Sequence, residues 1–472
     1  MKTIKTHRGL DIPLDGVAAE ITIDRRCVQL YGITPGDYVG LEPRLLVKEG
    51  DRVEAGQPII EDKRMTRVKL CSTVSGVVKE VRRGERRKII AIVIERSGEQ
   101  NVWQCDKNKM ESRDGAIEVM TQCGLWASVR QRPFGTIADP NGKARDVVVS
   151  LFDTAPSATN YEYTLKGREV EVAKGLEILA KMTEGRVIVG YRKGHLAKDV
   201  KTLTSSTANI EMYEVEGPHP AGNIGVILGA VAPINKGDTV WTMKVADIAT
   251  LGHLALTGIY KPERIVAIVG PDALKPQYCK ITNGANIGEL IEGEIANDNY
   301  PSMSYENNAN IRIVSGNVLS GRKVCKDDFI GAYDNEITLI AEGDKYDFMG
   351  WISPGVKKYS FSRTFASGFI PKGMWNKISL PNWMKPRFDT NLHGGERPFV
   401  FNGNFERVVP MDIYPLQLIK AAIIGDVELM EELGIYEIEP EDLALCEFID
   451  PSKNEIQTII RAALEQCRKE AM

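Results

Sequence analysis

Cysteine and histidine, the residue types that most often bind metals, are scattered singly along this chain. The eight cysteines include no C-x-x-C pair, and the five histidines include no H-E-x-x-H motif. A structural zinc site or an iron–sulfur cluster needs several such ligands at short spacing. The sequence therefore predicts no metal centre held by this chain alone. Dispersed cysteines are typical of reduced thiols in a cytoplasmic protein.

One lysine stands where carrier proteins attach a prosthetic group. Lys63 lies between VKEGDRVEAGQPI (47–59) and STVSGVVKEV (72–81), which resemble the two hairpins of biotinyl/lipoyl modules. Its neighbours Asp62 and Arg64 differ from the M-K-M sequence of a biotin acceptor. We therefore favour an unmodified structural β-module. The alternative, a free-standing lipoyl- or biotin-type carrier, predicts a mass increase at Lys63.

Nucleotide and proton chemistry each have one candidate motif. Gly222, Gly225 and Gly229 recur in an apolar stretch, but they do not form G-x-G-x-x-G. We interpret them as turn and packing residues, with an independent flavin or NAD oxidoreductase as the alternative. Such an enzyme would be coloured or would oxidise NADH. His219, in GPHPAG, is the most obvious proton carrier, and we favour a turn-stabilising role for it.

The elements that position these residues change in type along the chain. Short apolar strands are predicted at Asp146–Phe152, Arg186–Tyr191 and Asn223–Leu228, with a helix over Glu169–Met182 between the first two. The pattern predicts a multidomain α/β and β protein of four units: a biotinyl/lipoyl-like barrel-sandwich module (1–100), a Rossmann-like α/β domain (101–255), a ubiquitin-like β-grasp, SLBB-type domain (256–335), and a C-terminal domain that is first irregular and then helical (336–472).

Charge and hydropathy restrict the partners. The 60 basic and 64 acidic residues give a formal charge of -4, whereas nucleic-acid binding usually shows as a basic surplus. No apolar run reaches the roughly 18–20 residues that cross a bilayer. The nearest run, Ile224–Val231, is interpreted as a buried strand. We expect no nucleic-acid partner and a cytoplasmic chain that meets a membrane through other proteins.

Several local sequences together resemble one family. They stand in a fixed order along the chain: YVGLEPRLLVKEGDRVEAGQPIIEDK (38–63), RPFGTIADP (132–140), FDTAPSA (152–158), GPHPAGNIG (217–225), NGNFERVVPMDIYP (402–415) and EPEDLALCEF (439–448). The chain resembles, over essentially its full length, the A subunit of the sodium-translocating NADH:quinone reductase.

The resemblance implies a function within an assembly. The family's six-subunit complex oxidises NADH, reduces membrane quinone to quinol and exports Na+. FAD, FMN, riboflavin and the 2Fe-2S centre are expected in partner subunits, and no tightly bound cofactor is expected in this chain. The A subunit is implied to be peripheral, on the cytoplasmic face of the inner membrane, next to the membrane-embedded B subunit. There it would help to form the quinone site and the assembly.

Two family-matching strings have the chemistry to contact a quinone headgroup, which binds in an apolar slot with hydrogen-bond donors at its carbonyls. One string offers a tyrosine between glycines, and the other offers an aromatic ring beside an arginine. A structural role is the alternative for both strings. The candidate quinone-proximal residues are Gly36, Tyr38, Gly40, Arg132, Pro133 and Phe134.

A basic, aromatic segment from Ile370 to Phe388 is a candidate docking element. Trp375, Trp383 and Lys385 combine the aromatic and basic side chains that favour membrane boundaries and interface hot spots. We predict either contact with the membrane-embedded partner or a loop packed on its own domain.

Overall fold

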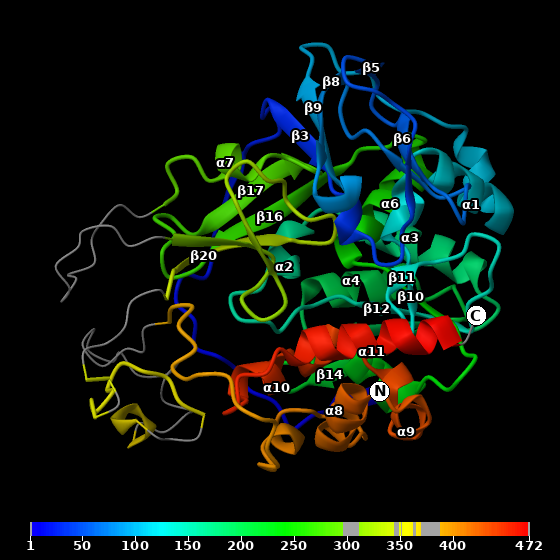
Figure 1. Cartoon of the computed structure of the whole chain (residues 1–472). Helices are drawn as coiled ribbons and strands as arrows, with labels where there is room; N and C mark the ends of the chain where they lie inside the picture. The colour runs from blue at the N-terminus through cyan, green and yellow to red at the C-terminus, as the bar shows by residue number, and fades with distance from the viewer. Residues whose placement is uncertain are drawn as a thin grey trace.

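The fold was analysed in a computed structural model of the 472-residue chain (Figure 1). The structure describes residues 2–295, 311–343, 349–350, 352–361, 365–369 and 388–470. Two large sheets, a small two-sheet module and a helical C-terminal unit pack together.

The small module contains the two predicted hairpins. Its four-stranded sheet has the order β3 (Leu30–Ile33), β9 (Ile89–Arg96), β8 (Gly76–Arg83) and β5 (Arg52–Val53). A three-stranded sheet has the order β4 (Pro43–Leu45), β6 (Pro58–Asp62) and β7 (Lys69–Cys71). Glycine is required at Gly76 because a Cβ there would lie 2.1 Å from the Glu95 carbonyl oxygen. This close approach of two backbones explains the glycine that marks the second hairpin.

The first strands of the chain leave this module. β1 (Lys2–Lys5) pairs in parallel with β14 (Ile210–Glu216), and β2 (Ala19–Asp24) pairs in parallel with β17 (Gln277–Thr282). Residues predicted to form one unit with the small module thus extend both large sheets. These pairings join residues about 200 or more positions apart, so local hydrophobic periodicity does not reveal them.

The first large sheet is seven-stranded, in the order β1-β14-β13-β12-β15-β10-β11. The strands β12 (Asp146–Ser150), β13 (Val187–Tyr191), β14 and β15 (Val240–Thr242) run parallel, whereas β10 (Arg130–Arg132) and β11 (Thr136–Ile137) are antiparallel additions. The chain moves outward from β12 to β14 and then returns to the other side of β12 with β15. The strand order therefore reverses between β12 and β15.

Helices connect and cover these strands (Figure 1). They are α1 (Arg113–Gln122), α2 (Tyr161–Thr164), α3 (Glu169–Met182), α4 (His195–Leu203), α5 (Ile224–Val231) and α6 (Val245–Thr257). The predicted helix over Glu169–Met182 is confirmed as α3. The predicted strand at Asn223–Leu228 and Ile224–Val231 is wrong, because these residues form α5. A short, uniformly apolar run has neither helical nor strand periodicity, so its type cannot be read from pattern alone.

The second large sheet has six strands, in the order β19-β18-β20-β16-β17-β2. Its strands include β16 (Glu263–Val269), β18 (Ile311–Ser315), β19 (Arg322–Val324) and β20 (Glu336–Ala341), and a short helix α7 (Ile287–Leu290) accompanies them. The prediction that the chain becomes irregular from residue 336 is wrong, because β20 is buried between β16 and β18. All six of its residues are buried, including the polar Glu336 and Thr338, so both faces of the strand are covered.

The C-terminal unit is helical, as predicted for its later part. It contains α8 (Pro415–Ile424), α9 (Val427–Glu432), α10 (Ala444–Ile449) and α11 (Ile456–Glu470). Figure 1 shows α11 alongside the seven-stranded sheet near β14. One buried cluster joins Val148, Ile188 and Val226 of the α/β unit to Leu416 and Ile460 of the C-terminal helices. The helices therefore complete the core beneath the sheet.

Candidate functional site

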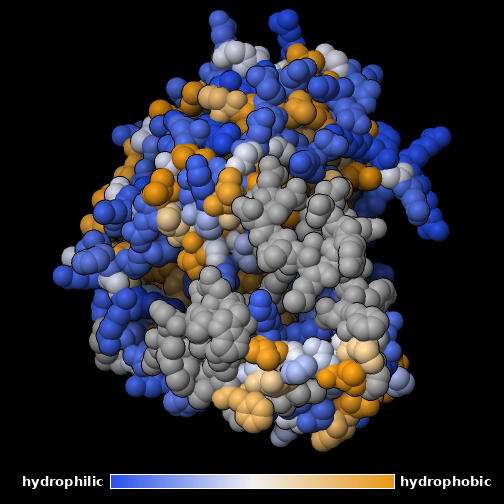
Figure 2. Space-filling model, turned by 90° about the vertical axis from the view of Figure 1, so that its left-hand side faces the viewer, coloured by the Kyte–Doolittle hydropathy of each residue, from blue (hydrophilic) through white to orange (hydrophobic). Residues whose placement is uncertain are grey.

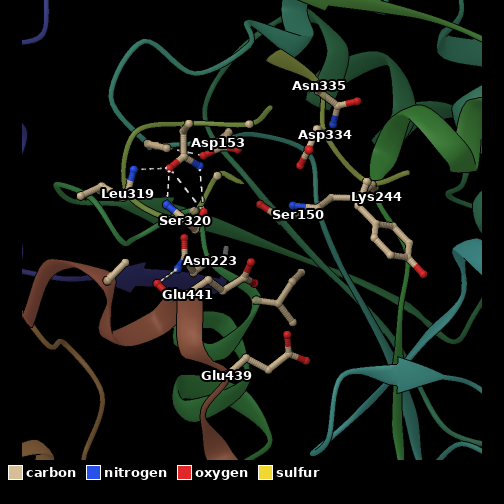
Figure 3. Close-up of a pocket in the computed structure, with 18 of the residues that line it drawn as sticks. Ser150, Asp153, Asn223, Lys244, Leu319, Ser320, Asp334, Asn335, Glu439 and Glu441 are labelled. Carbon is tan, nitrogen blue, oxygen red and sulfur yellow. Dashed lines mark hydrogen bonds between the residues drawn. The ribbon is translucent and has the colours of Figure 1, made fainter. Parts of the chain in front are cut away.

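A polar cavity of about 300 Å³ lies where all four units meet. Its walls come from the segment after β12, the segment after β15, the start of α5, a loop of the second sheet and the C-terminal unit (Figure 3). The site sits at the carboxyl ends of β12 and β15, where the strand order reverses. In open α/β sheets this switch point is the usual place for a ligand.

The loop after β12 is built without a glycine-rich turn. Residues 151–160 contain no glycine. Asp153 instead turns its carboxylate back onto the loop, where its Oδ1 accepts hydrogen bonds from the backbone N–H groups of Thr154 at 2.6 Å and Ala155 at 2.9 Å. These are donors of the kind that a bound phosphate uses in nucleotide-binding loops. The local structure thus disfavours a nucleotide phosphate here.

An acidic turn from the C-terminal unit closes the cavity. The 3-10 helix η9 (Pro440–Leu443) follows Glu439, and a reciprocal capping box joins Glu439 and Asp442. Asp442 lies at the start of α5, since a Cβ added at Gly225 would be only 2.2 Å from its Oδ2. The amide nitrogen of Asn223 donates to Asp442 Oδ1 at 3.2 Å. This carboxylate occupies the helix N-terminus, where an anionic ligand would otherwise be favoured.

Two arginines from β10 neutralise this acidic turn. Arg130 contacts Glu439 at 2.5 Å, and Arg132 contacts Asp442 at 3.2 Å and Glu439 at 3.4 Å. The side chain of Arg132 is only 2% exposed. Burial opposes the charge of Arg132, but Glu439, Asp442 and Glu441 outweigh it and raise the pKa of Arg132. The cluster ties β10 to the C-terminal unit.

Lys244 points into the same cavity from the end of β15 (Figure 3). Its ammonium has no hydrogen bond or ion pair within 4.0 Å to any residue in the described ranges. Burial by itself would lower the pKa of Lys244, but Glu441, Tyr161 and Asp153 raise it above the ordinary value. Lys244 is therefore a charged group inside the site that lacks a direct partner.

The cavity also contains a buried acid, Glu336, at the start of β20. It is 5% exposed, and its Oε2 lacks a hydrogen-bond partner among the described residues. Burial, together with Asp153 and Asp334, raises the pKa of Glu336 well above its ordinary value. Neighbouring Asn335 donates to the Tyr161 hydroxyl at 3.0 Å, while its own amide oxygen is buried without a partner in the described structure.

His219 also borders this cavity and serves the turn around it. Its Nδ1 lies 3.0 Å from the Thr154 hydroxyl, and its backbone N–H donates to Asp11 at 2.9 Å. Burial lowers the pKa of His219, although Asp153 and Asp11 oppose the shift. These contacts favour the turn-stabilising interpretation over a proton carrier at neutral pH.

Tyr38 lies at a second, smaller cavity of about 80 Å³. Its ring contacts that of Tyr333 edge to face, with centroids 5.6 Å apart. Asp247, Arg264 and Tyr260 also line this cavity. Burial raises the pKa of Asp247 to about 6, although Arg264 and Lys244 oppose the shift. Aromatic walls with a few polar groups are the type of lining expected for an organic ring.

The other predicted quinone-proximal residues lie outside the lining of the cavity that Tyr38 borders. Gly36 and Gly40 are exposed, and Gly40 lies against Thr136, since an added Cβ would be 3.1 Å from its Cγ2. This contact brings the two predicted strings together. Phe134 packs edge to face on Tyr436 at 6.0 Å and lines neither cavity, and Pro133 likewise lines neither.

Of the remaining sequence-based candidates, the structure describes Lys63 but not the docking residues. Lys63 is exposed in the bend between β6 and β7, where its backbone N–H donates to Glu42 at 2.9 Å. The docking candidates Trp375, Trp383 and Lys385 lie outside the described residues. Among the residues described, no group of three or more His, Cys, Asp or Glu side chains is arranged to hold a metal ion.

Sequence reasoning missed Lys244, Glu336 and Asp247. All three were hidden in apolar surroundings: Lys244 lies two residues after β15, Glu336 begins β20, and Asp247 lies in the first turn of α6. A charged residue at the edge of an apolar run was the available signal. Such a residue more often marks the solvent-exposed end of an element.

Together, the fold and the cavity define a multidomain protein in which a small β-module, an α/β sheet, a second mixed sheet and a helical unit enclose one polar site. Family models match most of this architecture: the NqrA N-terminal barrel-sandwich hybrid domain at residues 4–97, the NqrA second alpha/beta domain at 111–260 and the NQRA C-terminal domain at 265–326. The chain belongs to the NqrA family.

Curated relatives match over the whole chain. The A subunit of the Na(+)-translocating NADH-quinone reductase of Hahella chejuensis is 33% identical over 472 residues, covering 99% of this chain and 100% of the relative. The corresponding A subunit of Haemophilus influenzae is 32% identical over 478 residues, covering 100% of both chains. That of Rhodopirellula baltica is 32% identical over 475 residues, covering 99% and 98%. Within the described ranges, the helices are too short or too polar to span a membrane.

Proposed function

We propose that this chain is the peripheral A subunit of a six-subunit complex that oxidises NADH, reduces membrane quinone to quinol and exports Na+. The observation that carries the proposal is the similarity to relatives that bear this name, at about a third identity over their full length. The parallel order β14-β13-β12-β15 supports a Rossmann-like domain, and α7 beside the second sheet supports a β-grasp of the SLBB type.

The chain would organise the complex rather than transfer electrons. We infer that FAD, FMN, riboflavin and the 2Fe-2S centre belong to partner subunits. The glycine-free loop after β12 and the carboxylate at the start of α5 support this division, because both disfavour a flavin phosphate. The chain would lie on the cytoplasmic face, against the membrane-embedded B subunit.

The docking face would include Trp375, Trp383 and Lys385. Exposed apolar side chains flank their segment in sequence, including Phe369, which is 91% exposed, and Phe401, which is 69% exposed. Figure 2 shows that apolar side chains gather at the lower end of one face of the molecule. Exposed apolar side chains of this size are common at protein interfaces.

The quinone headgroup would bind close to Tyr38. Tyr38 and Arg264 supply hydrogen-bond donors, and Asp247 is protonated below about pH 6. Two donors on an aromatic-lined slot match the two carbonyl oxygens of a quinone. Arg132 is less suited to contact the quinone, because Glu439 and Asp442 already bind its guanidinium.

A photoreactive quinone tests this placement in the assembled complex. We expect crosslinks on peptides containing Tyr38 or Asp247, and a reduction of about tenfold in the labelling efficiency of Tyr38→Phe, since one hydrogen bond is lost. Tyr414→Phe, at a tyrosine 66% exposed and remote in sequence, is the matched control. Labelling confined to the membrane-embedded partner would contradict the proposed quinone contact and leave the assembly role standing.

A further inference from the structure

The larger cavity contains opposite charges that lack ion-pair partners. Lys244 follows β15 and Asp153 follows β12, so neighbouring parallel strands bring both to the switch point. Neither side chain forms an ion pair within 4.0 Å in the described structure, yet Glu441, Tyr161 and Asp153 lie close enough to raise the pKa of Lys244 against the effect of burial. The two charges are thus separated by a space rather than joined by a contact.

The backbone of Lys244 starts a helix beside the cavity. It is the N-cap residue of α6, where its carbonyl accepts from the N–H groups of Asp247 and Ile248. A cation at a helix N-terminus opposes the helix dipole, and the ammonium of half-buried Lys244 has no direct partner among the described residues. A bound anion would give it that partner and offset the helix dipole.

The other cavity walls add unsatisfied hydrogen-bonding groups. Glu336 is 5% exposed and has an unpartnered Oε2 within the described residues. The buried Asn335 Oδ1 likewise lacks a donor there. Both residues line the cavity, and buried polar atoms are nearly always hydrogen-bonded, so their unpartnered atoms call for a bound ligand or water.

The charge pattern selects among ligands. The N–H groups after β12 already bind Asp153, and the start of α5 already faces Asp442, so a phosphate has no built cradle. A quinone is disfavoured because its ring would be buried beside the polar side chains of Lys244, Asp153 and Glu441. A ligand that carries one anion and one cation matches the two unpaired charges.

We propose that this cavity binds a free α-amino acid or a similarly small zwitterion. Its carboxylate accepts hydrogen bonds from Lys244 and from Glu336, and its ammonium group lies toward Asp153 and Asn335 Oδ1. The volume of about 300 Å³ is at the lower end of ligand pockets, which suits a small metabolite. The inference is independent of the quinone contact, because it concerns a different cavity and a water-soluble ligand.

Calorimetric titration and thermal unfolding of the purified full chain test the proposal. The probes are the individual proteinogenic L-amino acids, followed by the amide and the N-acetyl derivative of the best binder. We expect saturable binding of at least one amino acid with a concentration-dependent rise in Tm. Each derivative should bind at least tenfold more weakly, because each removes one ligand charge.

Two variants locate the binding. Lys244→Gln should weaken it at least tenfold, whereas Lys193→Gln should leave it unchanged, because Lys193 is exposed and pairs with Glu214 outside the cavity. Glu336→Gln retains a neutral donor and should bind within a few-fold of the parent chain. A folded chain that binds no amino acid, equal binding by Lys244→Gln, or displacement by a short-chain quinone would overturn the proposal.

Discussion

At the scale of single residues, the protonation of the acidic side chains depends on burial and on nearby charges, not on the residues next to them in sequence. Glu439 and Asp442 stay matched to arginines, whereas Glu336 and Asp247 sit in surroundings that favour their neutral forms. Acidic side chains are therefore held by arginines at one position and are buried without such a direct partner at another. The difference lies in whether a positively charged side chain directly contacts the acid.

The carboxyl group of Asp247 makes stability depend on pH. Its pKa is about 6 in the folded chain, compared with an ordinary value of 3.8. Between about pH 4 and 6 the unfolded chain releases this proton while the folded chain keeps it. The free energy of unfolding therefore falls as pH rises, by up to about 3 kcal/mol, and the loss is complete above pH 6.

Asp247→Asn removes this titration. We expect the stability of the variant relative to the parent to rise by up to about 3 kcal/mol between pH 4 and 6, as measured by urea unfolding at several pH values. Asp199→Asn, at an exposed aspartate, should give a difference that does not change with pH. Parallel pH profiles for Asp247→Asn and the parent would show that Asp247 ionises normally.

At the scale of elements, the contact between α5 and η9 fixes the geometry of the larger cavity. Asp442 reaches the first turn of α5 only because residue 225 has no side chain. The carboxylate cannot easily move, since Asn223, Arg132 and the backbone N–H of Glu439 all donate to it. These contacts thereby fix the position of the η9 turn relative to α5, although the two lie more than 200 residues apart in sequence.

Substituting two glycines of α5 in turn distinguishes the effect of this contact from the general effect of alanine on helix stability. Gly225→Ala should destabilise the chain by about 1–3 kcal/mol, as overpacking in a rigid site does, and should loosen the η9 turn. Gly229→Ala places its Cβ 3.8 Å from Met411, an ordinary contact, and should be neutral or stabilising by up to about 1 kcal/mol. Thermal unfolding measures both, and equal effects would exclude a special constraint at Gly225.

At the scale of the whole molecule, the units are not independent. The buried cluster that includes Val53 of the small module continues through Val147 of the α/β sheet to Leu339 of the second sheet. The C-terminal helices share a different cluster with the α/β sheet. Since each unit completes the core of another, we expect them to unfold together.

Removal of the C-terminal helices tests this dependence. A chain ending at residue 398 should expose Val148, Ile188 and Val226 and leave Arg132 without Glu439 and Asp442. We expect aggregation and strong binding of a hydrophobic dye, because the uncovered apolar face is large. A chain ending at Arg468 retains Cys467 and is the control. A monomeric 1–398 chain with the parent Tm would show that the sheet is stable alone.

The sequence by itself determined the hairpins of the small module, the helix α3, the helical end and the family. These features depend on neighbouring residues: turn glycines, helical periodicity and ordered local motifs. It did not determine the type of Ile224–Val231, because a uniformly apolar run has no distinguishing period. Nor did it predict the strand at Glu336–Ala341, which pairs with β16 and β18. Tertiary structure alone decided that β1 and β2 extend the two large sheets. It alone also placed Lys244, Asp153 and Glu336 around one cavity, since charges from distant segments meet only after the chain folds.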